Sequence, residues 1–155
     1  MEIRSIKPND YMTLREIYVD AIQSRGLNFY SREQINAWAS LAVLPGALDS
    51  VFEFGKGWVI VEQKIIQAFV VSYPANRLAL LYCRGSAGRR GYASALIRRV
   101  ESVAVKNGII NLTTEASCFS YRLFLKSGWH LLSVEKIYIG GVAFDRYLMS
   151  KKLQA

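Results

Sequence analysis

The most informative stretch of the chain is LYCRGSAGRRGYASAL, residues 81–96. It starts inside a wholly apolar run, 78–83, of the kind that forms a buried central strand. A loop rich in glycine and arginine follows at 84–91, and apolar residues then recur at helical spacing from 93 to 104. The stretch therefore predicts a strand, a basic loop and the first turn of a helix in direct succession.

The start of the predicted helix is suited to a phosphate group. Unpaired backbone N–H groups and the positive end of the helix dipole lie there, and glycine lets the backbone approach an anion closely. Residues 84–106 hold six bases against one acid. The loop is neither a P-loop with Gly-Lys-Ser/Thr nor a Gly-x-Gly-x-x-Gly dinucleotide motif. A tight turn beside an arginine-covered surface helix is the alternative.

The rest of the chain surrounds this stretch with hairpins and helices. The expected order is β-αα-ββ-β-α-β-α-ββ, and consecutive hairpins argue against a doubly wound parallel sheet. We predict an α/β (α+β) fold with a mixed, mostly antiparallel sheet of about seven strands flanked by about four helices. The expected strands are 1–7, 58–62, 65–72, 78–83, 109–114, 129–139 and 142–153, and the expected helices are 8–26, 31–39, 92–108 and 117–126, with 40–57 as loop.

Length and composition limit the classes of protein. The chain has 155 residues, 52% of them hydrophobic, and a net charge of +8. At roughly 150 residues per domain, we expect a single domain over 1–155. No apolar run approaches the roughly 18 residues of a membrane span, so no membrane partner is expected. The two cysteines make neither a disulfide framework nor a zinc pattern, and the expected location is cytoplasmic.

The charge is divided unevenly along the chain. Residues 1–62 hold eight acids and six bases, whereas residues 63–155 hold four acids and fourteen bases. Such asymmetry indicates a polyanionic partner, either nucleic acid or a phosphorylated small molecule. A basic surface that only keeps the protein in solution is the alternative.

Residues 88–93 read Gly-Arg-Arg-Gly-Tyr-Ala, and residues 115–129 run from Glu-Ala-Ser to Leu-Phe-Leu-Lys-Ser-Gly-Trp. The first segment resembles the Gln/Arg-x-x-Gly-x-Gly/Ala motif of the GNAT superfamily, the acyl-CoA-dependent N-acetyltransferases. The second resembles the end of that family's fifth strand and its Phe-Tyr-Glu-Lys-x-Gly-Phe helix, and 141–149 resembles its closing strand. The order of elements is similar over essentially the whole chain. Two positions depart from the pattern: Gly88 replaces the first Gln/Arg, and Phe124 replaces a frequent tyrosine acid.

The resemblance implies an N-acetyltransferase that uses acetyl-CoA as co-substrate and no metal. It implies that an amine attacks the thioester directly, through a tetrahedral intermediate, in a split between the fourth and fifth strands. The fourth strand would bind the pantetheine arm, the loop would cradle the pyrophosphate, and the helix after the fifth strand would flank the thiol. The implied cofactor-binding residues are Leu81, Cys83, Gly88, Arg89, Arg90, Gly91, Tyr92, Ala93, Ser94, Ser117 and Phe124.

Direct attack requires a neutral amine, but a lysine-like amine has a pKa of about 10.4, so a general base helps. Some relatives keep a glutamate early in the fourth strand, where this chain has Arg77. Glu115, at the end of the fifth strand, is the predicted base, and Glu62 is the second candidate. Tyr121, one helical turn before Phe124, is the predicted acid. The alternatives are a solvated carboxylate at 115 and ordinary helix packing at 121.

Four aromatic residues are predicted to form the walls for the acceptor, because aromatic faces suit flat and cationic groups. They are Tyr18, Tyr30, Trp38 and Tyr82, with simple core packing as the alternative. The expected acceptor is a small-molecule or peptide amine.

Two other functions compete with this prediction. One is a catalytically silent acyl-CoA-binding relative, and the other is a basic nucleic-acid-binding module. A nucleic-acid partner is not expected, because the bases cluster on one loop and one helix instead of alternating with exposed aromatics. Long strands near the C-terminus could pair between two subunits, so a homodimer is a further expectation.

Overall fold

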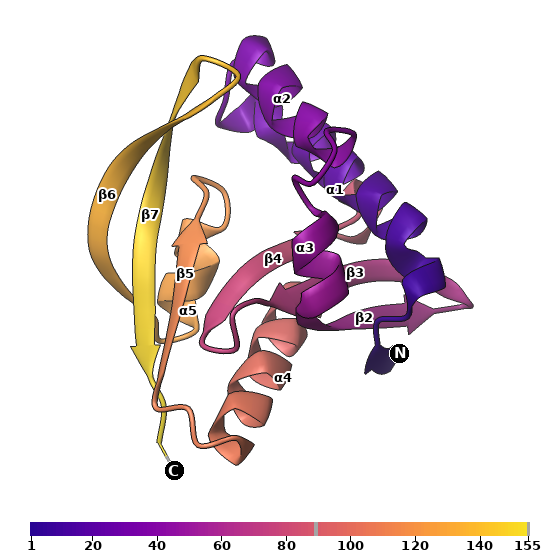
Figure 1. Ribbon diagram of the computed structural model, residues 1–155, viewed down its shortest axis with the longest axis vertical. Coiled ribbons are helices and arrows are strands. Elements are labelled where there is room, and N and C mark those ends of the chain that lie inside the picture. The colour runs from indigo at the N-terminus through magenta and orange to yellow at the C-terminus, as the bar shows by residue number, and fades with distance from the viewer. Residues whose placement is uncertain (89, 155) are drawn as a thin grey trace.

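A computed structural model describes residues 1–88 and 90–154 of the chain (Figure 1). Arg89, one of the predicted pyrophosphate contacts, lies outside the described residues. The α-helices within them are α1 (Tyr11–Arg25), α2 (Arg32–Ala39), α3 (Asp49–Phe54), α4 (Tyr92–Lys106) and α5 (Tyr121–Lys126). The strands are β1 (Glu2–Ser5), β2 (Lys56–Glu62), β3 (Ile65–Ser72), β4 (Arg77–Cys83), β5 (Asn111–Ala116), β6 (His130–Ile139) and β7 (Val142–Lys152).

The strands form one sheet in the order β1-β2-β3-β4-β5-β7-β6. Every neighbouring pair is antiparallel except β4 and β5, which are parallel. The predicted mixed, mostly antiparallel sheet of an α+β domain is therefore confirmed.

Helices cover both faces of this sheet, with α1, α2 and α3 on one side of β2–β4 and α4 on the other (Figure 1). Strand β2 shows the underlying pattern, because side chains of successive residues in a strand point to opposite faces. Trp58 and Ile60 belong to the core that contains Leu96 of α4, whereas Val59 belongs to the core that contains Ile17 of α1. Both faces are buried, which explains the nearly continuous apolar runs of the central strands.

Two of the expected segments differ in detail. Residues 40–57 are not only loop, because they contain α3, whose Phe52 is buried and stacks on Tyr11 at a ring distance of 5.3 Å. The helix expected from Ser117 begins instead at Tyr121. Ser117 and Ser120 form a turn before it, in which the Ser117 N–H donates to the Ser120 hydroxyl at 2.9 Å. Helix α3 was not predicted because its apolar residues span a single short segment between glycines and a proline, which are typical of loops.

The start of α2 is as predicted. Ser31 caps the helix by accepting from the Gln34 N–H at 3.1 Å, and the Gln34 side chain accepts from the Ser31 N–H at 2.9 Å. This capping box fixes where α2 begins, and therefore where Trp38 of α2 lies.

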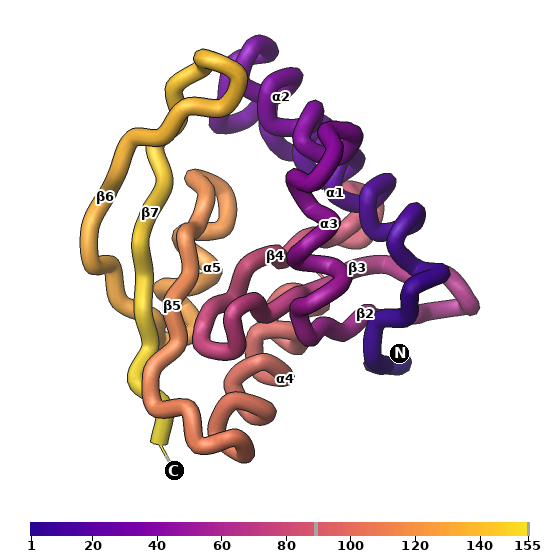
Figure 2. Tube along the Cα trace, in the orientation of Figure 1, coloured from indigo at the N-terminus to yellow at the C-terminus, as the bar shows by residue number. Residues whose placement is uncertain are grey.

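Strands β4 and β5 separate almost as soon as they meet. They pair only at Arg77 with Thr113 and at Leu78 with Thr114. Beyond these positions β4 continues beside β3, whereas β5 continues beside β7. Figure 2 shows the two strands diverging, so the middle of the sheet opens into a split.

The other end of the sheet is the long edge strand β6. Several of its apolar side chains are exposed, among them Leu132, Val134 and Tyr138. The predicted homodimer through this region stays a prediction. Among the described helices, none has the length and apolar character needed to cross a membrane.

Candidate active site

The glycine-rich loop joins β4 to α4 in the predicted way. Gly91 precedes α4 and has a φ of 78°, a left-handed conformation that favours glycine. A Cβ added there would meet no heavy atom within 4 Å, so the space beside Gly91 is open. The first turn of α4, with Tyr92, Ala93 and Ser94, follows this loop, and its N–H groups have no acceptor within the helix. The arrangement suits an anion such as a diphosphate.

Contacts from other elements hold the loop in place. The Tyr92 side chain is buried, and its hydroxyl donates to Glu62 at the end of β2. Glu62 is also 3.9 Å from the N-terminal amine. From α1, the carboxylate of Asp20 accepts a hydrogen bond from the Gly85 N–H at 2.7 Å. Glu62, the second candidate base, therefore belongs to the support of the loop.

Strand β4 presents backbone groups to the split. Arg84 donates its N–H to Gln67 of β3 at 2.9 Å, and alternate residues of a strand bond to opposite sides. The N–H groups of Leu81 and Cys83 therefore point away from β3, toward the side that β5 has left. This supports the prediction that both residues offer amides to a pantetheine arm. Burial raises the pKa of the Cys83 thiol to about 11, so it stays protonated near neutral pH.

Three adjoining cavities follow the split. The loop cavity, about 50 Å³, lies between Arg25, Cys83 and Ala93 and reaches Ser120. The split cavity, about 60 Å³, shares Leu81, Tyr82, Phe119 and Ser120 with it. The aromatic pocket, about 210 Å³, shares Trp38, Ala79, Tyr82, Glu115, Ala116 and Ser117 with the split cavity. The shared walls place the three cavities in a row, from the first turn of α4 to the aromatic pocket.

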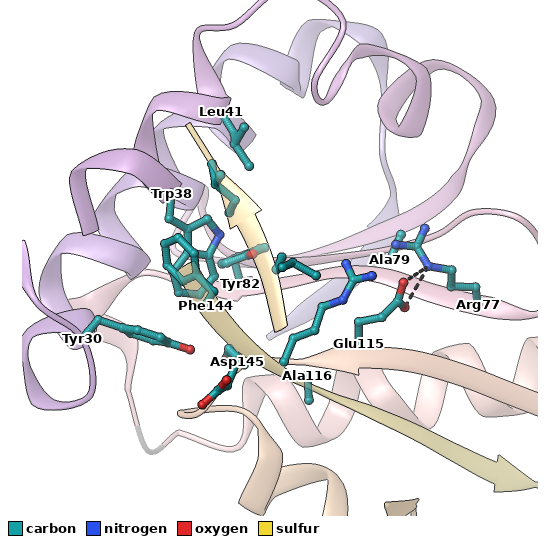
Figure 3. Close-up of a pocket in the computed structure, with 14 residues that line it drawn as sticks. Tyr30, Trp38, Leu41, Arg77, Ala79, Tyr82, Glu115, Ala116, Phe144 and Asp145 are labelled. Carbon is teal, nitrogen blue, oxygen red and sulfur yellow. Dashed lines mark hydrogen bonds and ion pairs between the residues drawn. The ribbon is translucent and has the colours of Figure 1, made fainter. Parts of the chain in front are cut away.

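Three of the four predicted acceptor walls line the aromatic pocket: Tyr30, Trp38 and Tyr82 (Figure 3). The rings of Tyr30 and Trp38 meet edge to face at 5.4 Å. Tyr18 is not on the wall of this pocket. It is 2% exposed and packs against Tyr82 at a ring distance of 4.7 Å, so it supports Tyr82 from the core.

Burial also sets the protonation of the tyrosines around the pocket. It raises the pKa values of Tyr18, Tyr30 and Tyr82 above the ordinary range, so their hydroxyls stay neutral at any physiological pH. The Tyr30 hydroxyl accepts a hydrogen bond from the Cys118 N–H at 2.9 Å, which ties this wall to the turn after β5. The pocket therefore offers neutral aromatic surface to a ligand.

Glu115 lies where the split cavity and the aromatic pocket meet. Both of its oxygens accept from Nε of Arg77, at 3.1 and 2.9 Å (Figure 3). Nη1 of Arg77 also donates to the Tyr73 carbonyl at 2.9 Å. The Glu115 side chain is 18% exposed and comes from β5, whereas Arg77 comes from β4. The ion pair thus bridges the two strands at the point where they separate.

No protein-family model matches this chain. The curated relative YafP of Escherichia coli K12, named an uncharacterized N-acetyltransferase, is 25% identical over 154 residues, covering 99% of this chain and 97% of that protein.

Solved structures of GCN5-related N-acetyltransferase type share the fold. One from Rhodopseudomonas palustris superposes with a TM-score of 0.93 at 24% identity, covering 98% of this chain and 95% of that one. PaiA N-acetyltransferase of Thermoplasma acidophilum, in complex with coenzyme A, has a TM-score of 0.72 at 19% identity, covering 98% and 99%. The chain therefore has the fold of the GCN5-related N-acetyltransferases (GNAT).

Within this GNAT fold, the second motif contributes to the cavities as expected at two positions. Ser117 and Phe124 line the split cavity, and Phe124 is buried, with its ring 5.0 Å from that of Trp129. Tyr121 is on the wall of none of the three cavities formed by the described residues, and its ring stacks on Tyr147 at 4.5 Å. Its role as acid stays a prediction.

Several residues that line the cavities were not predicted from the sequence. They are Arg25, Leu41, Phe119, Ser120, Ile137, Ile139, Phe144, Asp145 and Arg146. Asp145 and Arg146 lie on β7, which reaches the pocket only because β7 pairs with β5. Among the described residues, no group of three or more His, Cys, Asp or Glu side chains could hold a metal ion.

Proposed function

We propose that this protein transfers an acetyl group from acetyl-CoA to a primary amine by direct attack. The observation that carries the proposal is a row of three adjoining cavities that leads from the first turn of α4, along the open edge of β4, to an aromatic pocket bordered by Glu115. In this proposal the row is the path along which cofactor and amine meet: one end suits a phosphate group, and the other end suits a cation.

The residues along the path fit acetyl-CoA. The open space before Gly91 and the unpaired amides of the first turn of α4 suit its diphosphate. Leu81 and Cys83 offer strand amides to the pantetheine arm, and one of these amides could also stabilise the oxyanion of a tetrahedral intermediate. The coenzyme A complex of PaiA, which has the same fold, supports this assignment.

The aromatic pocket fits the acceptor. An amine arrives as a cation, and the faces of Tyr30, Trp38 and Tyr82 attract cations. Glu115 is the acid of the pocket that also borders the split cavity, so it can take the proton that the amine must lose. The two acceptor classes we propose are small-molecule amines and peptide amines.

The departing thiolate needs less protonation by a general acid than an alkoxide would, since a thiol has a pKa near 8.5. Tyr121 is the proposed acid that protonates the departing thiolate. Its side chain lines none of the three cavities formed by the described residues. The Tyr121→Phe variant tests this role. The proposal requires slower thiol release in that variant, and unchanged release would remove Tyr121 from the mechanism.

The first test is the melting temperature with acetyl-CoA, CoA and a short oligonucleotide. A ligand at 100 times its Kd should stabilise the protein by about 2.7 kcal/mol. Stabilisation by both CoA species and not by the oligonucleotide is expected. Stabilisation by the oligonucleotide alone would favour a nucleic-acid-binding module and contradict the proposal.

A catalytically silent acyl-CoA-binding protein is the second candidate, because Arg77 already occupies both oxygens of Glu115. The two candidates differ in one measurement, which is thiol release from acetyl-CoA over a panel of amines. An enzyme releases thiol only when an accepted amine is present. A silent relative binds acetyl-CoA and releases none with any amine.

A further inference from the structure

Arg25, the last residue of α1, lies against the glycine loop. A Cβ added to Gly88 would be 2.2 Å from Nη2 of Arg25 and 3.3 Å from its Cζ. Gly88 itself has φ −63° and ψ 147°, which any residue adopts. The backbone therefore does not require glycine at 88, and the guanidinium of Arg25 fills the place that a side chain would take.

No acid of the described residues forms an ion pair with this guanidinium. Arg25 is half-buried and lines the loop cavity together with Cys83 and Ala93. Among residues 1–88 and 90–154, no hydrogen bond or ion pair involves its guanidinium. Asp20, an acid on the same helix, is engaged with the Gly85 N–H. A partly buried cation without a partner is unfavourable, so its position indicates a ligand that carries negative charge.

We propose that Arg25 is a cofactor-binding residue whose guanidinium contacts the diphosphate of CoA beside the first turn of α4. The inference rests on the proposed function. A guanidinium presents a planar fork of N–H donors that matches phosphate oxygens in pairs. Arg25 of α1 thereby places a side chain at the position where Gly88 has none.

The experiment measures Kd values by calorimetry for CoA, for dephospho-CoA and for acetyl-pantetheine, which carries no phosphate. Arg25→Ala should weaken CoA and dephospho-CoA equally, by about tenfold or more, because a hydrogen bond to a charged group is lost. Acetyl-pantetheine should bind as it does to the wild type. Arg25→Lys should bind with intermediate affinity, since it keeps the charge and loses the fork.

Arg32→Ala is the matched control. Arg32 is an exposed arginine at the start of α2, so its removal changes the net charge equally without touching the loop. This control should bind all three compounds as the wild type does.

Gly88→Ala provides an independent variant that keeps Arg25 in the sequence. The new methyl group displaces the guanidinium from the loop, because the two cannot share the space. Gly88→Ala should therefore weaken CoA binding much as Arg25→Ala does. Combining the two changes should weaken it no further, because the same contact is already lost.

The outcomes separate the inference from the proposed function. If the wild type binds no CoA, the proposed function fails and the inference with it. If the wild type binds CoA but Arg25→Ala binds equally well, the inference alone is overturned. Equal losses in Arg25→Ala and Arg32→Ala, or an equal loss for acetyl-pantetheine, would overturn it too. If Arg25→Ala does not fold, tight CoA binding by Gly88→Ala would overturn it.

Discussion

Gly91 and Gly108 make a matched pair at the two ends of α4. Their φ angles are 78° and 76°, and a Cβ added to either would meet no heavy atom within 4 Å. Replacing either by alanine therefore adds no clash and costs only the strain of a left-handed residue, about 1 kcal/mol. For a chain of this size, that lowers the melting temperature by about 3 °C. The two variants should be equally destabilised without ligand.

Their binding of CoA should differ. The methyl group of Gly91→Ala enters the open space before the loop, where the diphosphate is proposed to lie, whereas Gly108 lies at the far end of α4. We expect Gly91→Ala to weaken CoA binding at least tenfold and Gly108→Ala to leave it unchanged. Thermal unfolding gives the stability of both variants, and calorimetry gives the Kd values. Equal CoA affinities of the two variants would refute the placement of the diphosphate at this loop.

Three further predictions concern the base, the acceptor wall and an ion pair outside the site. Glu115→Gln should lower kcat at least about 100-fold with little change in the KM for acetyl-CoA, and an unchanged rate and pH profile would remove Glu115 as the base. Trp38→Leu should raise the KM for a cationic amine about tenfold through loss of the aromatic face, and steady-state kinetics with a neutral competing ligand would show whether only packing was lost. Asp10 accepts from Arg4 at 2.8 and 3.1 Å, and this contact holds the pKa of its carboxyl below the ordinary value, so its stabilisation is present above about pH 4 and is lost as the pH falls. Asp10→Asn should therefore cost about 2 kcal/mol at pH 7 and much less at pH 3 in urea unfolding, and an equal cost at both pH values would contradict the role of the charge.

The sequence predicted those features that depend on interactions between residues close together in the chain. Apolar periodicity predicted the strands and the long helices, the Ser31 capping box predicted the start of α2, and glycine spacing predicted the loop before α4. Each of these features depends on neighbours within a few positions along the chain. Helix α3 was missed because its short apolar face lies among glycines and a proline.

The site depends on contacts between distant segments, which local patterns do not contain. Arg77 and Glu115 are recognisable as charged residues, but their pairing follows from the parallel register of β4 and β5. Arg25 reaches the loop only because α1 packs beside it. The aromatic residues were recognisable as candidates, but only packing separates Tyr18 in the core from Trp38 on the pocket wall.

The most direct test of the central claim counts both products of one reaction. Acetyl-CoA and an accepted amine are incubated with the protein, and free thiol and acetylated amine are measured together, the latter by mass spectrometry. The account predicts equal amounts of the two products, with both formed only when acetyl-CoA, amine and protein are all present. Thiol released without acetylated amine, or neither product with any amine while CoA binds, would contradict it.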